Sequence, residues 1–367
     1  MSRGARRSSM TARPATLLAA VAALAAVAAV AALAGCAAGG ARELSGDLMT
    51  HDPALAEESG TSYVYSTGNA TIADGNIQIR GSRDGSSWRY RGEVWQAKPE
   101  WLVDAVPGVG NLWAPELIEH EGTWYLYYSA STFGSNTSVI ALATNETLDP
   151  DATEYEWVDR GPVIASADGD DFNAIDAGIA VDEAGRPWMA FGSFWSGIRM
   201  VALEWPSGAR ADAAEPLRLA DRRVPPNAIE APYVVAHDGD YFLFVSRDSC
   251  CRGLESTYNI AVGRADAITG PYLDRDGVPL LEGGGTLLLA AEGDRVGPGG
   301  QSVSGDTLAL HYYDRRFDGA FQLALVELEW DSEGWPTATL TAIAAGSFER
   351  MPGMPIGVVT RASAASS

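Results

Sequence analysis

The sequence is poor in cysteine and histidine, the residues that most often hold structural metals. Its 367 residues include three cysteines and four histidines, and no two cysteines stand in a CxxC spacing. Structural zinc sites usually need four such ligands at close spacings, so the sequence gives no sign of one. Cys250 and Cys251 are neighbours, and two states remain open for them: a vicinal disulfide or two buried thiols.

Basic residues are scarce as well. Lysine and arginine number 26 against 48 aspartates and glutamates, for a net charge of −22. Four of the arginines stand in the first 35 residues, so the rest of the chain has 22 bases and a net charge of −26. Such a surface repels nucleic acids and anionic membranes. The charge suits an exported protein that acts on a neutral substrate.

A long apolar run near the N-terminus indicates an export signal. Arginines at positions 3, 6, 7 and 13 accompany an Ala/Leu/Val run that ends in Leu33-Ala34-Gly35-Cys36. This order is typical of a secretory signal peptide, and its last four residues resemble a bacterial lipobox. We therefore expect Cys36 to carry lipid and to anchor the protein on the outer face of the membrane. Arg6-Arg7 leaves twin-arginine export open beside the general route, and an uncleaved membrane anchor is the alternative.

The chain after the signal has no long periodic helix. Aromatic and β-branched runs of four to eight residues alternate with Gly, Asp and Asn turns from Met49 onward. A unit recurs every ~55–65 residues: an acid, a short strand, a tight turn, and an aromatic-rich strand that ends in serine. Its copies lie at 52–66, 115–129, 175–193 and 229–246, with a weaker fifth at 305–313.

About five such units predict an all-β fold, a five-bladed β-propeller, because each unit must bury its faces against its neighbours. We expect a signal at 1–36, a tether at 37–46, the propeller at 47–350 and a C-terminal tail at 351–367. A β-sandwich is the competing fold. It does not explain why the acids recur in register.

The recurring acids are the candidate catalytic residues. Asp52, Asp176 and Glu230 stand in apolar or aromatic surroundings at the starts of three inner strands. A carboxylate in such surroundings is costly unless it has a use. Two carboxyls that flank a sugar bond, one as proton donor and one to activate water or attack, are the usual machinery of glycoside hydrolysis. A third acid can orient the donor and set its pKa.

A series of short segments is more specific in its order than any one segment alone. The segments are His51-Asp52-Pro53, Trp113-Ala114-Pro115-Glu116, Asn173-Ala174-Ile175-Asp176, Ala228-Ile229-Glu230-Ala231-Pro232 and Leu310-His311-Tyr312-Tyr313-Asp314, with others at 65–68, 125–129, 191–198, 250–253, 256–259 and 262–264. In this order they resemble glycoside hydrolase family 43, and within it the endo-1,5-α-L-arabinanases. The match covers about Met49 to Trp330.

The resemblance implies roles for the three acids. Asp52 would be the general base, Glu230 the general acid, and Asp176 the residue that tunes and orients the acid. The family inverts the anomeric configuration, which implies carboxyls roughly 6.5–9.5 Å apart. Glu116 occupies the acid position of the second copy, where the family has no catalytic role, and we expect it to support the site from behind.

Aromatic and small polar residues near the acids are candidate sugar contacts. Trp113, Phe133, Phe194 and Trp195 could each cover the C–H face of a sugar. Asn173, Ser131 and Ser193 could bind sugar hydroxyls or could simply cap turns. For the other aromatics a core position is favoured, as expected for residues in alternating strands: Tyr125, Tyr127, Tyr128, Phe242 and Phe244.

His311 is the candidate metal ligand. We place it in the inner strand of the fifth copy, and the resemblance implies that it helps hold a central calcium whose other ligands are mainly water. A histidine that only fills the axis is the alternative, because calcium prefers oxygen. Two positions depart from the family pattern: Gly300 stands where a histidine is frequent, and Ala265 where a serine is.

The predicted function is therefore endo-acting, inverting hydrolysis of α-1,5-linked L-arabinan, a plant cell-wall polysaccharide, by a monomeric lipoprotein that uses calcium. An exo-acting arabinanase, an arabinofuranosidase or a β-xylosidase of the same family is the alternative. A non-catalytic glycan-binding lipoprotein that feeds a transporter is the rival from another class. The intact acids oppose it, since a binding protein would tolerate Asn or Gln at these positions.

Overall fold

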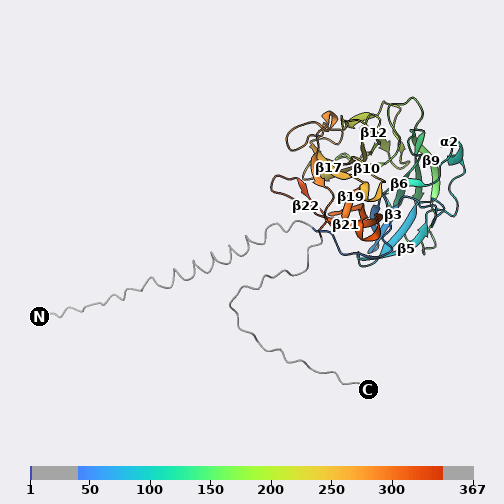
Figure 1. Ribbon diagram of the computed structural model, residues 1–367, viewed down its shortest axis with the longest axis horizontal. Coiled ribbons are helices and arrows are strands. Elements are labelled where there is room, and N and C mark those ends of the chain that lie inside the picture. The colour runs from blue at the N-terminus through green and yellow to red at the C-terminus, as the bar shows by residue number, and fades with distance from the viewer. Residues whose placement is uncertain (2–39, 342–367) are drawn as a thin grey trace, which may run out of the picture.

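The computed structural model describes Met1 and residues 40–341 and shows a five-bladed β-propeller, as predicted (Figure 1). Cys36 and the expected tail at 351–367 lie outside the described residues. Within residues 40–341, no helix is long and apolar enough to cross a bilayer.

Each blade is an antiparallel sheet whose first strand lies innermost. The first blade has β2 (Ala54–Glu58), β3 (Thr61–Ser66), β4 (Gln78–Ser82) and β5 (Ser87–Glu93), and the second has β6 (Leu112–His120), β7 (Thr123–Ala130), β8 (Ser138–Asn145) and β9 (Val158–Ser166). The third has β10 (Gly178–Val181), β11 (Pro187–Phe191), β12 (Ile198–Glu204) and β14 (Leu217–Ala220), with β13 (Ala209–Arg210) beside β12. The fourth has β15 (Ile229–His237), β16 (Asp240–Arg247), β17 (Asn259–Ala265) and β18 (Thr286–Leu289), and the fifth has β19 (Arg295–Ser304), β20 (Thr307–Asp314) and β21 (Ala320–Glu327). The inner strands β2, β6, β10, β15 and β19 contact one another in a closed ring.

Short elements complete the fold outside the blades. They are α2 (Trp101–Ala105), the 3-10 turns η1 (Gly253–Glu255), η2 (Leu280–Glu282) and η3 (Arg315–Phe317), and the hairpin β22 (Glu329–Trp330) with β23 (Pro336–Thr337).

The fifth blade has three strands of its own and is completed by the start of the described chain. Ala41 forms an antiparallel bridge with Val326, and the Arg42 N–H donates to the Leu325 carbonyl at 2.8 Å. Farther on, β1 (Ser45–Gly46) pairs with β5 in the first blade. Residues 41–46, which the composition assigns to a tether, therefore pair with strands of the fifth and first blades. An open blade edge offers unpaired N–H and C=O groups, and this segment satisfies part of that edge.

Five apolar clusters hold the ring together, one at each interface between blades. Successive side chains of a strand point to opposite faces of the sheet, so one strand contributes to two interfaces between blades. Tyr128 faces the first blade, and Tyr125 and Tyr127 face the third. Phe242 and Phe244 lie between the fourth and fifth blades. All five rings are buried, as expected.

His311 does not lie in an inner strand, so that placement was wrong. It belongs to β20, the second strand of the fifth blade, and stands opposite Gly299 of β19. Its ring nevertheless reaches Asp52 in the first blade, because the inner strand has glycine beside it. A Cβ on Gly300 would lie only 2.8 Å from His311 Nδ1. The two glycines thus open the inner strand for a side chain from behind it.

Candidate active site

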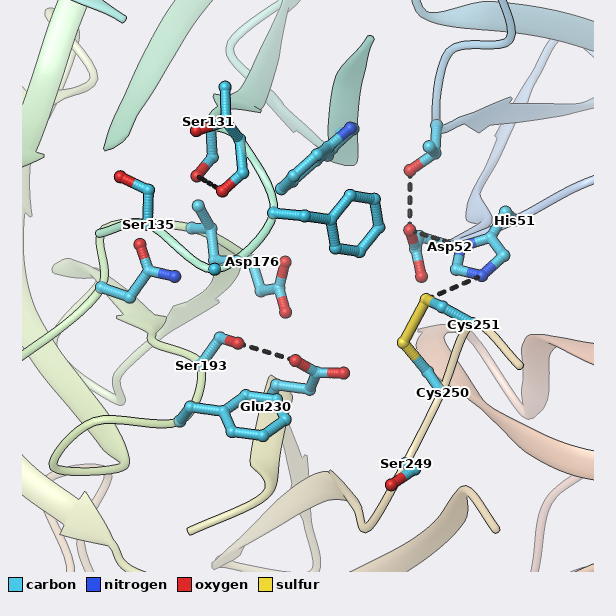
Figure 2. A pocket seen from close by; sticks show the side chains of 18 of the residues that line it. His51, Asp52, Ser131, Ser135, Asp176, Ser193, Glu230, Ser249, Cys250 and Cys251 are labelled. Carbon is cyan, nitrogen blue, oxygen red and sulfur yellow. Dashed lines mark hydrogen bonds and ion pairs between the residues drawn. A yellow bond between two sulfur atoms is a disulfide. The ribbon is translucent and has the colours of Figure 1, made fainter. Parts of the chain in front are cut away.

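A cavity of about 660 Å³ lies where the inner strands begin. Asp52 and Asp176 each stand two residues before the first residue of their strands, β2 and β10, and Glu230 is the second residue of β15. The ring of inner strands therefore directs all three carboxyls into one cavity. Figure 2 shows them pointing into the same hollow from different sides.

The fourth acid of the repeat, Glu116, does not line this cavity. The register of β6 against β7 shifts between Trp113 and Glu116, as at a β-bulge. Trp113 consequently lines the cavity, whereas Glu116 is only 3 % exposed. Burial raises the pKa of Glu116 well above its usual value. Glu116 is thus a buried residue of the inner strand β6 outside the cavity, and the supporting role expected for it stays a prediction.

Asp52 is surrounded by groups that favour its charge. Its Oδ2 accepts hydrogen bonds from Thr67 Oγ1 at 2.6 Å and His51 Nδ1 at 2.8 Å. Burial alone would raise the pKa of Asp52, but the charge and hydrogen bond of His51, the nearby His311 and the Thr67 hydroxyl together hold it well below its usual value. The Asp52 backbone has a positive φ of 49°, a conformation that aspartate tolerates better than most residues. Asp52 is therefore a fixed, ionised carboxylate.

Glu230 lies in the opposite electrostatic situation. Burial raises the pKa of Glu230; the Ser193 and Tyr258 hydroxyls oppose this rise, and the negative charge of Asp52 adds to it. Ser193 Oγ donates to Oε2 at 2.7 Å, and Tyr258 Oη donates to Oε1 at 2.9 Å. The net result is a carboxyl that keeps its proton to higher pH than an exposed glutamate does.

Asp176 connects the other two acids. Its Oδ2 accepts the backbone N–H of Ala231 at 3.1 Å, directly after Glu230, and its own N–H donates to Ser129 Oγ at 3.0 Å. Burial, followed by the negative charges of Glu230 and Asp52, raises the pKa of Asp176 well above its usual value. Asp176 and Glu230 therefore titrate as a coupled pair.

The residues expected to contact sugar all line the cavity: Trp113, Ser131, Phe133, Asn173, Ser193, Phe194 and Trp195. Trp113 and Phe133 contact each other with ring centroids 5.1 Å apart, and Phe133 is 82 % exposed. Ser138 Oγ joins Ser131 Oγ at 2.7 Å and donates to Asn173 Oδ1 at 2.7 Å. That contact leaves the Asn173 amide nitrogen without a partner among the described residues.

Several residues of the site carried no assigned role in the sequence. His51 and Thr67 hold Asp52, and Tyr258 holds Glu230. Cys250 and Cys251 form a disulfide that lines the cavity beside His51 (Figure 2), which decides between the two states left open for them. These residues stand close to motif residues in the sequence, and that closeness was the available signal. No local pattern shows which side chain contacts which acid.

Asp52 also belongs to a candidate metal group with two histidines. His51, Asp52 and His311 offer ligand atoms within 4.8 Å of one another, so the group could hold a metal ion. His311 Nδ1 accepts the Asp52 N–H at 3.1 Å, whereas its Nε2 is buried without a partner among the described residues. A neutral ring that accepts at Nδ1 carries its hydrogen on Nε2. The residues thus fit calcium only indirectly, with its shell made mostly of water and His311 reaching that water.

Comparisons with known proteins agree with this geometry. The family model described as glycosyl hydrolases family 43 matches residues 46–336. The chain is 39 % identical over 303 residues to the extracellular exo-α-(1→5)-L-arabinofuranosidase ArbA of Cellvibrio japonicus, covering 78 % of this chain and 85 % of that protein. It is also 39 % identical over 291 residues to the extracellular endo-α-(1→5)-L-arabinanase 1 of Bacillus subtilis, covering 79 % and 87 %.

Among solved structures, the family 43 endo-arabinanase from Bacillus licheniformis superposes with a TM-score of 0.76 at 39 % identity, covering 80 % of this chain and 99 % of that one. The match to the family model spans all five blades and the whole cavity. The chain therefore belongs to glycosyl hydrolases family 43.

Proposed function

We propose that this protein hydrolyses α-1,5-linked L-arabinan with inversion at the anomeric carbon. The observation that carries the proposal is that two carboxyls line one cavity and have pKa values shifted in opposite directions: the pKa of Asp52 is lowered and that of Glu230 is raised. Carboxyls whose pKa values are pushed apart divide into a base and an acid. Such a pair across a sugar-sized cavity is what an inverting glycosidase needs.

Each acid has a distinct task in this proposal. Asp52, held by Thr67 and His51, takes a proton from the water that attacks the anomeric carbon. Glu230 gives its proton to the leaving sugar oxygen, and the Ser193 and Tyr258 hydroxyls hold its carboxyl in place and stabilise the charge that remains. Asp176 titrates as a coupled pair with Glu230, so that ionisation of either carboxyl favours the protonated form of the other, and it fixes the strand through the Ala231 N–H.

The substrate assignment rests on the relatives and on the cavity lining. Both extracellular relatives act on α-1,5-linked arabinose chains according to their names. Aromatic side chains beside hydroxyl-binding groups suit a neutral polysaccharide, and Phe133 and Trp195 reach the solvent-exposed rim. We propose endo action because exposed rings at the rim provide contacts for sugar units beyond the cleaved bond. Exo action is the second candidate, since the exo-acting relative is as similar to this chain as the endo-acting one.

The products from debranched linear arabinan test these proposals. Endo action releases a ladder of short oligosaccharides and lowers viscosity early, whereas exo action releases arabinose or one fixed small product. Proton NMR of the first product separates inversion from retention. Release of xylose from xylo-oligosaccharides, with none of arabinose from arabinan, would move the assignment to β-xylosidase. A protein that binds arabinan and releases nothing would be the glycan-binding alternative.

Three further proposals accompany the activity. Calcium near His311 would supply positive charge close to the acids and stabilise the folded state, with no part in proton transfer. Cys36 would anchor the protein to the outer face of the membrane by lipid. The protein would act as a monomer.

A further inference from the structure

The disulfide between Cys250 and Cys251 is a covalent feature of the cavity wall to which the roles above give no task. Both residues line the cavity, and Cys251 is exposed. Cys251 Sγ lies 3.9 Å from His51 Nε2, and His51 in turn contacts Asp52. Figure 2 shows the two sulfur atoms beside these residues. The disulfide is thus next to the proposed base.

This disulfide adds little to the global stability of the fold. It joins residues that are neighbours in sequence. A disulfide stabilises a protein mainly by closing a chain loop in the unfolded state, and the effect grows with loop length. A bond across one peptide unit closes almost no loop. Its presence in the cavity wall therefore calls for a local explanation.

The main chain around the disulfide is held firmly. The loop joins β16 to β17, and Thr257 N–H donates to the Ser249 carbonyl at 2.9 Å across its base. The Cys251 N–H donates to Tyr313 Oη at 2.8 Å, and Tyr313 Oη lies 3.0 Å from His51 Nε2. The sulfur atoms are therefore presented to the cavity from a fixed position.

The chemistry of the disulfide suits one face of a sugar. Divalent sulfur is polarizable and only weakly polar, so it contacts C–H groups favourably. The cavity already has an aromatic surface from the second blade, Trp113 and Phe133. The disulfide adds a second apolar surface from the fourth blade. In an inverting reaction the base lies beside the sugar whose anomeric carbon is attacked.

We propose that the Cys250–Cys251 disulfide is a substrate-binding surface that contacts the C–H face of the arabinofuranose unit attacked with the help of Asp52. The inference rests on the proposed arabinan hydrolysis. It predicts that the covalent sulfur pair contributes to sugar binding rather than to global stability.

Binding is best measured without turnover, in a Glu230→Gln background, with a linear arabino-oligosaccharide in a calorimeter. Replacing both cysteines, as Cys250→Ser with Cys251→Ser, should raise Kd about tenfold, because two apolar sulfur contacts become hydroxyls. A phosphine reductant and one water molecule convert the S–S bond to two thiols: the water oxygen goes to the phosphine oxide and its two hydrogens go to the sulfur atoms. The reductant should also weaken binding in folded protein that keeps both cysteines, and should change nothing in the double serine variant. The third cysteine of the chain, Cys36, is shared by both proteins.

Leu254→Ala is the matched control. Leu254 follows the disulfide in the same loop, is 38 % exposed and does not line the cavity. This variant should bind the oligosaccharide like its parent. Thermal melting of every variant reports whether the fold has changed.

A Kd that stays within about twofold after both serine substitution and reduction would overturn the inference, whatever happens to Tm. Wild-type protein that cleaves arabinan while the disulfide variants bind normally would refute this inference alone. Wild-type protein that neither cleaves arabinan nor binds its oligosaccharides would refute the proposed function, and this inference with it.

Discussion

Replacing Gly300 by alanine displaces the proposed base, Asp52, without replacing any of the three acids. Gly300 has a φ of +59°, and its backbone packs directly on Asp52 and His311. A Cβ there would lie 2.8 Å from His311 Nδ1 and closer still to Asp52 Oδ1, whereas ordinary contact begins at 3.4 Å. His311 would have to shift by about 0.6 Å and Asp52 by about 1 Å.

Two effects of this substitution can be separated. Alanine in a left-handed conformation costs roughly 1–2 kcal/mol of stability wherever it occurs. Displacing a catalytic group by about 1 Å costs on the order of 10²-fold in rate. We therefore expect Gly300→Ala to lower kcat/KM on arabinan about 100-fold and to lower Tm by only several degrees.

Gly305→Ala is the matched control. Gly305 lies in the turn between β19 and β20, has a φ of +56°, and has nothing within 4 Å of the added Cβ. It should lose similar stability and keep its activity. The reasoning is refuted if Gly300→Ala, folded at the assay temperature, retains kcat/KM within about threefold of Gly305→Ala.

Other perturbations test the remaining assignments. Asp52→Ala and Glu230→Ala should each lower kcat about 10²–10⁴-fold with an unchanged fold, and more than a tenth of the activity in either would reassign that residue. Asp176→Asn should move the basic limb of the pH–rate profile to lower pH, because it removes the carboxyl that titrates together with Glu230 and whose ionised form favours protonated Glu230; a uniform fall at every pH would mean that Asp176 only positions the acid. A chelator should lower activity and Tm, added calcium should restore both, and His311→Ala should blunt the response; protein purified without calcium that ignores the chelator would exclude the ion. Cys36→Ser should abolish lipid attachment, and wild-type protein found free in the medium after cleavage at another site would exclude the lipobox.

The repeat in the sequence was sufficient to predict the propeller. The strand–turn–strand unit recurs with an acid at one position, and identical units can stack only in a ring or a solenoid. Because Asp52, Asp176 and Glu230 stand at the starts of three inner strands, they had to meet at one end of the ring. These conclusions depend on local patterns alone, and the residues expected to contact sugar also line the cavity.

Tertiary structure decided which groups surround each acid. Asp52 meets His311 across 259 positions of sequence, and Glu230 meets Ser193 across 37. Periodicity shows which face of a strand is buried but not which distant side chain packs against it. The lowered pKa of Asp52 and the raised pKa of Glu230 depend on these neighbours and on burial. Two similar carboxyls in similar motifs therefore become a base and an acid only in the folded protein.

The conformation of the backbone caused the other differences between the sequence predictions and the structure. A register shift in β6 sends Trp113 to the cavity and Glu116 to the interior, although both stand in one motif. Glycines in β19 let His311, which was expected in the inner strand, reach Asp52 from the second strand. Patterns of polarity in the sequence thus determined the blades and the position of the acids. Bulges, glycines and long-range contacts, which leave no periodic signal, determined the chemistry of the site.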